Sequence, residues 1–241
     1  MTQLLQKYLN KPFDDTGSQP IPFEPVILFP GSQEMIKQRQ NMVETQLKGR
    51  DIADRRVLKA MTEIPRHKFV DQGLANGAYA DNPLPIGFGQ TISQPYIVAF
   101  MSQALGLELS DRVLEIGSGC GYHSAVLSRL AGSVYTVELI AGLFEKGREN
   151  IKKMGLKNVW SRHGDGGAGW PEMAPFTAIT VAAYASRRPR VLLEQLSPGG
   201  RLIIPMGQPG SQNLTLFKKS PSSLITSHNL LPCRFVPLVG G

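Results

Sequence analysis

A glycine-rich segment near the middle of the chain constrains the fold more than any other feature. Residues 113–122 read Val-Leu-Glu-Ile-Gly-Ser-Gly-Cys-Gly-Tyr, an apolar strand pattern that runs through glycines into a helical pattern. Glycines let the backbone turn tightly and let a ligand approach the main chain. The spacing is G-x-G-x-G, whereas dinucleotide-binding proteins have G-x-G-x-x-G, and this difference argues against an NAD site. The segment predicts a cofactor loop between a strand and a helix; another nucleotide cofactor, or a glycine turn without a ligand, stays open as an alternative.

Strands and helices alternate from residue 112 onward. The apolar runs predict strands at 112–116, 134–137, 159–162, 178–181, 202–204 and 214–217, with the last two as a possible antiparallel pair. Helices are expected after the glycines, at 141–154 and at 191–196, where Pro198-Gly199-Gly200 ends the last one. This alternation predicts an α/β fold, a doubly wound and mostly parallel sheet with helices on both faces.

The first half of the chain has a different character. Residues 1–33 are rich in proline and predict an irregular arm that either packs on the body or extends from it. One helix is expected after Ser32 and another after Asp51, and residues 65–95 predict a long, mostly irregular segment. We therefore expect a domain from 34 to 241, with a helical part at 34–110 and a Rossmann-like core at 111–241.

Composition excludes several classes of protein. Lys and Arg outnumber Asp and Glu by 26 to 19, which gives a net charge of +7, but the basic residues are scattered and predict no nucleic-acid partner. No apolar stretch is long enough to cross a membrane, and the N-terminus does not resemble a secretion signal. Two cysteines, Cys120 and Cys233, are expected to be reduced thiols, which favours the cytoplasm. The four histidines lack the spacing of metal ligands, so no metal is predicted.

Three acidic positions follow predicted strands, where open α/β sheets bind ligands. Glu115 lies two residues before Gly117, and its carboxylate could meet an ammonium group of the cofactor. Glu138 ends the next strand, 21 residues after Gly117, and could accept both hydroxyls of a ribose. Asp165, in His163-Gly-Asp-Gly166, either accepts from an adenine amino group or caps a turn. A strand, an acid and G-x-G-x-G in this order are typical of S-adenosylmethionine-dependent methyltransferases.

One further segment is more specific than the glycine loop. Residues 84–96 read Leu-Pro-Ile-Gly-Phe-Gly-Gln-Thr-Ile-Ser-Gln-Pro-Tyr, and the chain ends in Arg234-Phe-Val-Pro-Leu-Val239. With Ile64-Pro-Arg-His-Lys-Phe-Val70 and Gly199-Gly-Arg-Leu-Ile-Ile-Pro205, these segments resemble the protein-L-isoaspartate O-methyltransferase family over residues 35 to 241.

The resemblance implies a Rossmann-like methyltransferase fold with a seven-stranded sheet and S-adenosyl-L-methionine as methyl donor. It implies that isoaspartyl-containing proteins and peptides are the acceptors, that methylation of the free carboxylate starts repair through a succinimide, and that the enzyme is a monomer. The family's active-site serine falls on Ser93. The cofactor-binding positions then fall on Thr91, Ile92, Ser93, Glu115, Gly117, Gly119, Gly121, Glu138, Leu139, Asp165 and Gly166.

Some residues allow two interpretations. Ser93 either donates a hydrogen bond to the acceptor or caps the helix that follows Pro95. Asp81 either touches the substrate or belongs to a turn. The chain departs from the family pattern at Thr177, Ala182 and Ser186–Pro189. These departures leave two rivals: methylation of a normal aspartate in one dedicated peptide, and a cofactor-binding module without catalysis.

Overall fold

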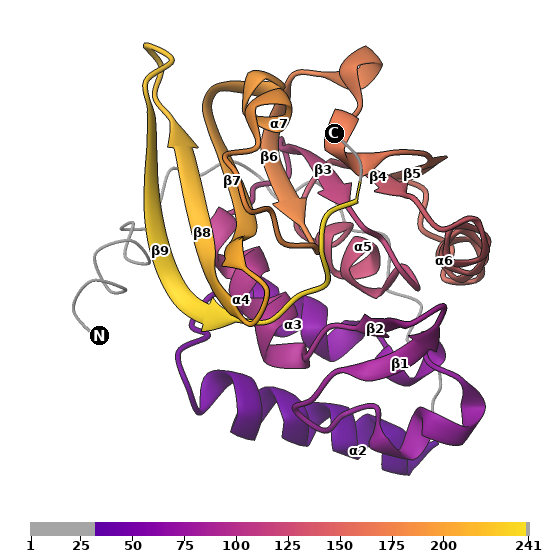
Figure 1. Cartoon of the computed structure of the whole chain (residues 1–241). Coiled ribbons are helices and arrows are strands. Elements are labelled where there is room, and N and C mark those ends of the chain that lie inside the picture. Colours follow the sequence, from indigo (N-terminus) through magenta and orange to yellow (C-terminus); the bar gives the residue numbers. More distant parts are fainter. Residues whose placement is uncertain (1–31, 240–241) are drawn as a thin grey trace.

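A seven-stranded sheet organises the molecule, which is described by a computed structural model over residues 32–239 (Figure 1). The strands lie in the order β5-β4-β3-β6-β7-β8-β9. Their bounds are Arg112–Ile116 (β3), Ser133–Glu138 (β4), Val159–His163 (β5), Phe176–Val181 (β6), Leu196–Gln208 (β7), Ser211–Lys219 (β8) and Ile225–Cys233 (β9). Strands β3 to β7 are parallel, and β8 runs antiparallel to both of its neighbours. The predicted α/β class and the mostly parallel sheet are therefore confirmed.

Helices cover both faces of the sheet. They are α2 (Gln33–Asn41), which continues as a π-helix over Met42–Lys48, α3 (Arg55–Glu63), α4 (Pro95–Leu105), α5 (Tyr122–Leu127), α6 (Ala141–Lys153) and α7 (Arg190–Glu194). Short 3-10 turns occupy Arg66–Lys68, Gln72–Gly77, Gly166–Ala168 and Pro171–Met173. A separate hairpin pairs β1 (Leu84–Gly87) with β2 (Gln90–Ile92). In Figure 1 this hairpin and α2 lie at the end of the sheet toward which β3 and β6 point.

The alternation of side chains along each strand explains how the layers form. Val113, Val134 and Ile203 pack into the core beneath α3, α4 and α5. Their chain neighbours Leu114, Tyr135 and Leu202 point to the opposite face and pack with α7. Because both faces of the central strands are buried, these strands read as continuous apolar runs, which is why the sequence located them.

The order of the strands places a crevice at one point of the sheet. The chain moves outward from β3 through β4 to β5, and then returns to β6 on the other side of β3. Ligands of open α/β sheets bind at the carboxyl ends of strands beside such a switch. The glycine loop follows β3 directly, so the fold brings it to this position.

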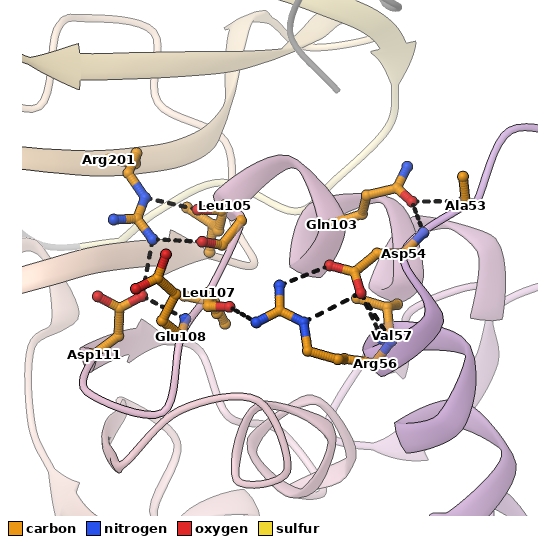
Figure 2. Close-up of polar contacts among 11 residues, drawn as sticks. Ala53, Asp54, Arg56, Val57, Gln103, Leu105, Leu107, Glu108, Asp111 and Arg201 are labelled. Carbon is orange, nitrogen blue, oxygen red and sulfur yellow. Dashed lines mark hydrogen bonds and ion pairs between the residues drawn. The ribbon is translucent and has the colours of Figure 1, made fainter. Parts of the chain in front are cut away.

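Polar contacts fasten the helical part to the core (Figure 2). Arg201 of β7 donates to the carbonyls of Leu105 and Gly106 at 2.6 and 2.9 Å and pairs with Asp111 at 2.8 Å. Gln103 of α4 accepts from the amides of Ala53 and Asp54 at 2.7 and 2.8 Å. These bonds join α4 to the residues that precede α3, and they join the end of α4 and the loop after it to β7.

Several element boundaries differ from the sequence-based expectation. The second helix begins at Arg55, because the carboxylate of Asp54, and not that of Asp51, accepts from the amides of Arg56 and Val57. Residues 65–95 are less irregular than expected, since they hold the β1–β2 hairpin and two 3-10 turns. Strand β7 begins at Leu196 and includes Pro198-Gly199-Gly200, with a register shift against β6. Strand β9 was not expected at all.

The N-terminal arm predicted for residues 1–33 lies almost wholly outside the described residues. Within residues 32–239, no helix is long and apolar enough to cross a membrane. Over the same range, no group of three or more His, Cys, Asp or Glu side chains is placed to hold a metal ion.

Candidate active site

A cavity of about 750 Å³ opens at the carboxyl ends of β3 and β6. Six segments form its wall: the stretch from Pro83 to Met101, the glycine loop with the start of α5, the junction of β4 with α6, the turn after β5 at Gly166, the loop after β6, and residues 232–239. These segments come from both halves of the chain, so the cavity exists only in the folded domain. Its volume lies within the range of small-molecule sites, about 300–1,000 Å³.

Positive φ angles shape the glycine loop. Gly117, Gly119 and Gly121 have φ values of +84°, +52° and +85°, which other residues rarely adopt. A Cβ on Gly119 would approach Ile86 Cδ1 to 3.0 Å, so this glycine lets the hairpin close over the loop. A Cβ on Gly121 would lie 3.1 Å from the carbonyl of Gly147, so Gly121 allows α5 to pack against α6.

Glu138, the last residue of β4, is buried at the cavity wall. Its Oε2 accepts from the amide of Gly119 at 2.8 Å, and its Oε1 accepts from the amide of Ile140 at 3.0 Å. Each carboxylate oxygen retains capacity for a further hydrogen bond. The carboxylate is therefore held in place with acceptor capacity for a ligand.

Ser93 lies between β2 and α4 and lines the cavity with Thr91, Ile92 and Gln94. The alternative that Ser93 caps the helix is wrong, because Gln94 is the N-cap residue of α4 and the cap has no side-chain hydrogen bond of its own. The Ser93 hydroxyl makes no hydrogen bond to any other group among residues 32–239. It is available to a ligand.

The C-terminal segment closes the opposite side of the cavity. Tyr184 and Pro237 form a parallel bridge, in which the amide of Tyr184 donates to Val236 and the amide of Leu238 donates to Tyr184, both at 2.8 Å. In Figure 1 this segment leaves β9 and crosses the carboxyl ends of the strands. Arg234 lies exposed on it and lines the cavity.

Glu115 takes a position behind the glycine loop. It is fully buried, does not line the cavity, and accepts a hydrogen bond from the hydroxyl of Ser124. Burial raises the pKa of Glu115 to about 7. His123 Nδ1 lies 3.9 Å from Glu115 Oε1, and burial lowers the pKa of His123 to about 4. The predicted contact of Glu115 with a cofactor ammonium, directly or through water, stays a prediction for a residue that does not itself line the cavity.

The protein-L-isoaspartate(D-aspartate) O-methyltransferase family model matches residues 37–241. The chain belongs to this family. The resemblance inferred from residues 84–96 and from the glycine loop is thereby confirmed.

Relatives within the family are similar over nearly their whole length. A protein-L-isoaspartate O-methyltransferase of Methylorubrum extorquens is 48% identical over 226 residues, which cover 94% of each chain. Another, from Anaeromyxobacter dehalogenans, is 51% identical over 189 residues, 78% of this chain and 90% of that one.

Solved structures of the family share the fold. One protein-L-isoaspartate O-methyltransferase gives a TM-score of 0.77 at 33% identity and covers 84% of this chain and 66% of that chain. A second structure, from Plasmodium falciparum, gives a TM-score of 0.73 at 27% identity and covers 83% of this chain and 97% of that chain. It is described as a putative protein-L-isoaspartate O-methyltransferase in complex with S-adenosyl-L-homocysteine.

Most of the family's predicted site positions meet at this one cavity. Eight line it: Thr91, Ile92, Ser93, Gly117, Gly119, Glu138, Leu139 and Gly166. Glu115, Gly121 and Asp165 do not. Of the two roles expected for Asp165, the structure shows the cap of a turn, because its Oδ1 accepts from the amide of Gly167 at 2.7 Å.

Sequence reasoning assigned no site role to three side chains in the wall: Cys120, His123 and Arg234. Burial raises the pKa of Cys120 to about 11, so its thiol stays protonated at neutral pH and serves packing. Arg234 belongs to a segment that resembles the family, but only the Tyr184–Pro237 bridge brings it to the cavity. No local pattern in the sequence signals that contact.

The departures from the family pattern have structural explanations at two positions. Thr177 exchanges hydrogen bonds with the backbone of Arg112 at the amino ends of β6 and β3, opposite the cavity. Ala182 lines the cavity, and its Cβ would lie 3.5 Å from a Cβ on Gly117. Arg187 and Arg188 are exposed, and the Arg188 guanidinium lies 5.8 Å from the Phe217 ring centroid.

Proposed function

We propose that this cavity transfers a methyl group from S-adenosyl-L-methionine to the free carboxylate of L-isoaspartyl residues in damaged proteins and peptides. One observation carries the proposal. The glycine loop with Glu138, which suits the donor, and the Ser93 loop, which suits the acceptor, line a single cavity in a chain of this family.

The residues present fit the donor. Glu138 offers two fixed carboxylate oxygens to the ribose hydroxyls, beside Leu139. Gly117, Gly119 and Gly166 also line the cavity, where they would hold the amino-acid end and the adenine of the molecule. When bound, S-adenosylmethionine supplies an electrophilic methyl group on a positively charged sulfonium.

The acceptor needs little chemical activation. A free α-carboxylate has a pKa of about 3.3–3.7 and is ionised at neutral pH, so no general base is required. His123 supports this assignment, since its lowered pKa leaves it neutral and its Nε2 already lies 3.1 Å from the hydroxyl of Ser102. The protein's task is to align the carboxylate and to exclude water, and alignment can contribute up to about 7–11 kcal/mol in model reactions.

We propose that two side chains orient the acceptor. The Ser93 hydroxyl can donate a hydrogen bond to one carboxylate oxygen and leave the other free to attack the methyl group. Arg234, on the opposite wall, supplies positive charge for an anionic peptide. After release, the backbone nitrogen of the residue that follows in the peptide attacks the ester carbonyl and expels methanol, so a succinimide forms without help from the protein, and addition of water returns part of it to normal aspartate.

The test is methyl transfer from labelled S-adenosylmethionine to a matched pair of peptides that differ only in isoaspartate or aspartate. We expect base-labile label, released as methanol, from the isoaspartyl peptide alone. Label in the aspartyl peptide alone would favour a dedicated aspartyl acceptor. Cofactor binding without labelling of either peptide would favour a dedicated aspartyl acceptor of another sequence or a module without catalysis.

Ser93→Ala tests the assigned role of the serine. We expect lost turnover with retained cofactor binding, and unchanged turnover would remove Ser93 from the mechanism. We further propose that the enzyme is a monomer and that it acts in the cytoplasm. The two free thiols support the second of these properties. Light scattering of the purified chain measures the first of these properties directly.

A further inference from the structure

The carboxylate of Asp81 lies outside the cavity but contacts two residues that closely follow Ser93 in the chain. Its Oδ2 accepts from the side-chain amide of Gln94 at 2.7 Å, and its Oδ1 accepts from the backbone amide of Tyr96 at 3.2 Å. Asp81 itself does not line the cavity, whereas Ser93 and Gln94 do. Any effect of Asp81 on the reaction must therefore pass through the segment that carries Ser93.

The hydrogen bond from the Tyr96 amide lets Asp81 act as a cap for helix α4. Tyr96 is the second residue of α4, and N–H groups in the first turn of a helix have no partner within the helix. Neither Gln94 nor Ser93 caps them with its own side chain. A carboxylate at this position is also favourable for the helix dipole. Asp81 thus caps α4 from 15 residues upstream, and the Ser93 hydroxyl remains available to the cavity.

Arg50 holds the carboxylate in place. Its Nη1 lies 2.9 Å from Asp81 Oδ2, and its guanidinium carbon lies 3.4 Å from the centroid of the Tyr96 ring. One arginine therefore contacts both the carboxylate and the residue whose amide the carboxylate caps. The arrangement fixes Asp81 against α4 from the side of the N-terminal helices.

We infer that Asp81 is a positioning residue for the methyl transfer, because it caps α4 and thereby keeps Ser93 directed at the acceptor. This inference rests on the proposed role of Ser93. Without the carboxylate, the Tyr96 amide loses this acceptor, and we expect the hydroxyl of Ser93, three residues earlier in the chain, to turn toward it, since serine is a preferred capping residue. The hydroxyl would then be lost to the substrate.

A double-mutant cycle tests the inference, with Asp81→Asn, Ser93→Ala and the double variant. Asparagine has a single acceptor oxygen, which the Arg50 charge and the Gln94 amide attract, so its NH2 group then faces the Tyr96 amide and no longer caps it. We expect Asp81→Asn to lower kcat about tenfold or more, with the dissociation constant of S-adenosylhomocysteine changed by less than about threefold. The double variant should match Ser93→Ala within about twofold, because Asp81 acts only through Ser93.

Glu172→Gln is the matched control. It also removes a carboxylate charge from an arginine pair at 2.9 Å, here with Arg162 and away from the cavity. We expect it to retain the kcat of the unmodified enzyme. Amide hydrogen exchange supplies a readout that needs no turnover: exchange over residues 94–97 should be faster in Asp81→Asn and unchanged in Glu172→Gln.

Three outcomes would overturn the inference: an unchanged kcat in Asp81→Asn, a double variant whose loss is the product of the two single losses, or unchanged exchange over residues 94–97. Loss of cofactor affinity and thermal stability together with kcat would assign Asp81 to folding alone. Failure of the proposed function has a different signature, since the unmodified enzyme would then leave the isoaspartyl peptide unlabelled while the exchange comparison still reports on Asp81.

Discussion

At the scale of single residues, we expect Glu138 to couple the shape of the glycine loop to ligand binding, because its carboxylate accepts from the amide of Gly119 at the cavity wall. In Glu138→Gln, one side-chain donor must face the amide of Gly119 or of Ile140, where the carboxylate accepted from both. Hydrogen bonds to charged groups contribute about 1.5–3 kcal/mol, so we expect cofactor affinity to fall about 10- to 100-fold. Titration calorimetry with S-adenosylhomocysteine measures the change. Glu145→Gln, which alters an exposed pair with Arg148 on α6, is the control and should bind normally.

Glu115 predicts a pH dependence of stability. Its pKa rises from the ordinary 4.5 to about 7 in the fold, so the folded state holds a proton that the unfolded state releases between these values. Folding stability from this group is present below about pH 4.5 and is lost as pH rises through about 7. Glu115→Gln cannot titrate and removes this loss. As pH rises from about 4.5 to about 7 and beyond, the free energy of unfolding of Glu115→Gln should therefore gain up to about 3 kcal/mol relative to that of the unmodified chain.

Urea unfolding of both proteins without cofactor, at about pH 4.5 and about pH 8, gives this difference. Comparing the two chains at each pH cancels the titration of all other groups. An equal difference at both pH values would show that Glu115 does not titrate between them.

At the scale of elements, the β1–β2 hairpin reaches across the cavity to α6. Phe88 lies at its tip with φ +54°, between two glycines of positive φ, and remains 62% exposed. Its ring rests on Gly142, where an added Cβ would come within 2.1 Å of Phe88 Cζ. The residues on either side of this contact, Ile86 and Ile140, line the cavity. The contact therefore closes the cavity wall between hairpin and helix.

Gly142→Ala should lift the hairpin tip from α6. Because φ is ordinary at Gly142, an alanine fits the helix backbone and its methyl group conflicts only with the movable Phe88 ring. We expect dissociation of S-adenosylhomocysteine to accelerate about tenfold, which corresponds to roughly 1.4 kcal/mol, with little change in unfolding temperature. Stopped-flow measurement of dissociation checks this expectation. The same rate in both proteins would mean that the hairpin does not retain the ligand.

The elements also show how far sequence reasoning reaches. Strands β3, β4 and β6 are buried on both faces, so their apolar runs were predictable within two residues. Strand β9 is an edge strand with Ser227, His228 and Asn229 in its middle, and its polar sequence carries no core pattern. The glycine loop was predictable because strand, turn and helix are contiguous. The place of Arg234 in the cavity wall was not predictable, because only a tertiary contact brings it there. Asp81 was a candidate from its position before the Gln90–Tyr96 segment, but its contacts with Gln94 and Tyr96 were not predictable.

At the scale of the whole molecule, the helical part and the Rossmann-like core share one hydrophobic core. Met42 and Val57 belong to the same buried cluster as Val113 and Ile203. The contacts around Arg201 and Gln103 add polar ties across the same junction (Figure 2). We therefore expect calorimetry to show a single unfolding transition for the chain, whereas two resolved transitions would mean that the two parts fold independently.

Arg201→Ala should weaken this junction without touching the active site. The substitution removes three hydrogen bonds and leaves the largely buried carboxylate of Asp111 with only the amide of Glu108, at 2.8 Å. Breaking a partly buried pair of this kind costs about 2–4 kcal/mol, which lowers the unfolding temperature of a domain of this size by about 5–15 °C. Since Arg201 does not line the cavity, kcat well below that temperature should stay unchanged. A lower kcat in the folded variant would mean that the junction shapes the site as well as stabilising the fold.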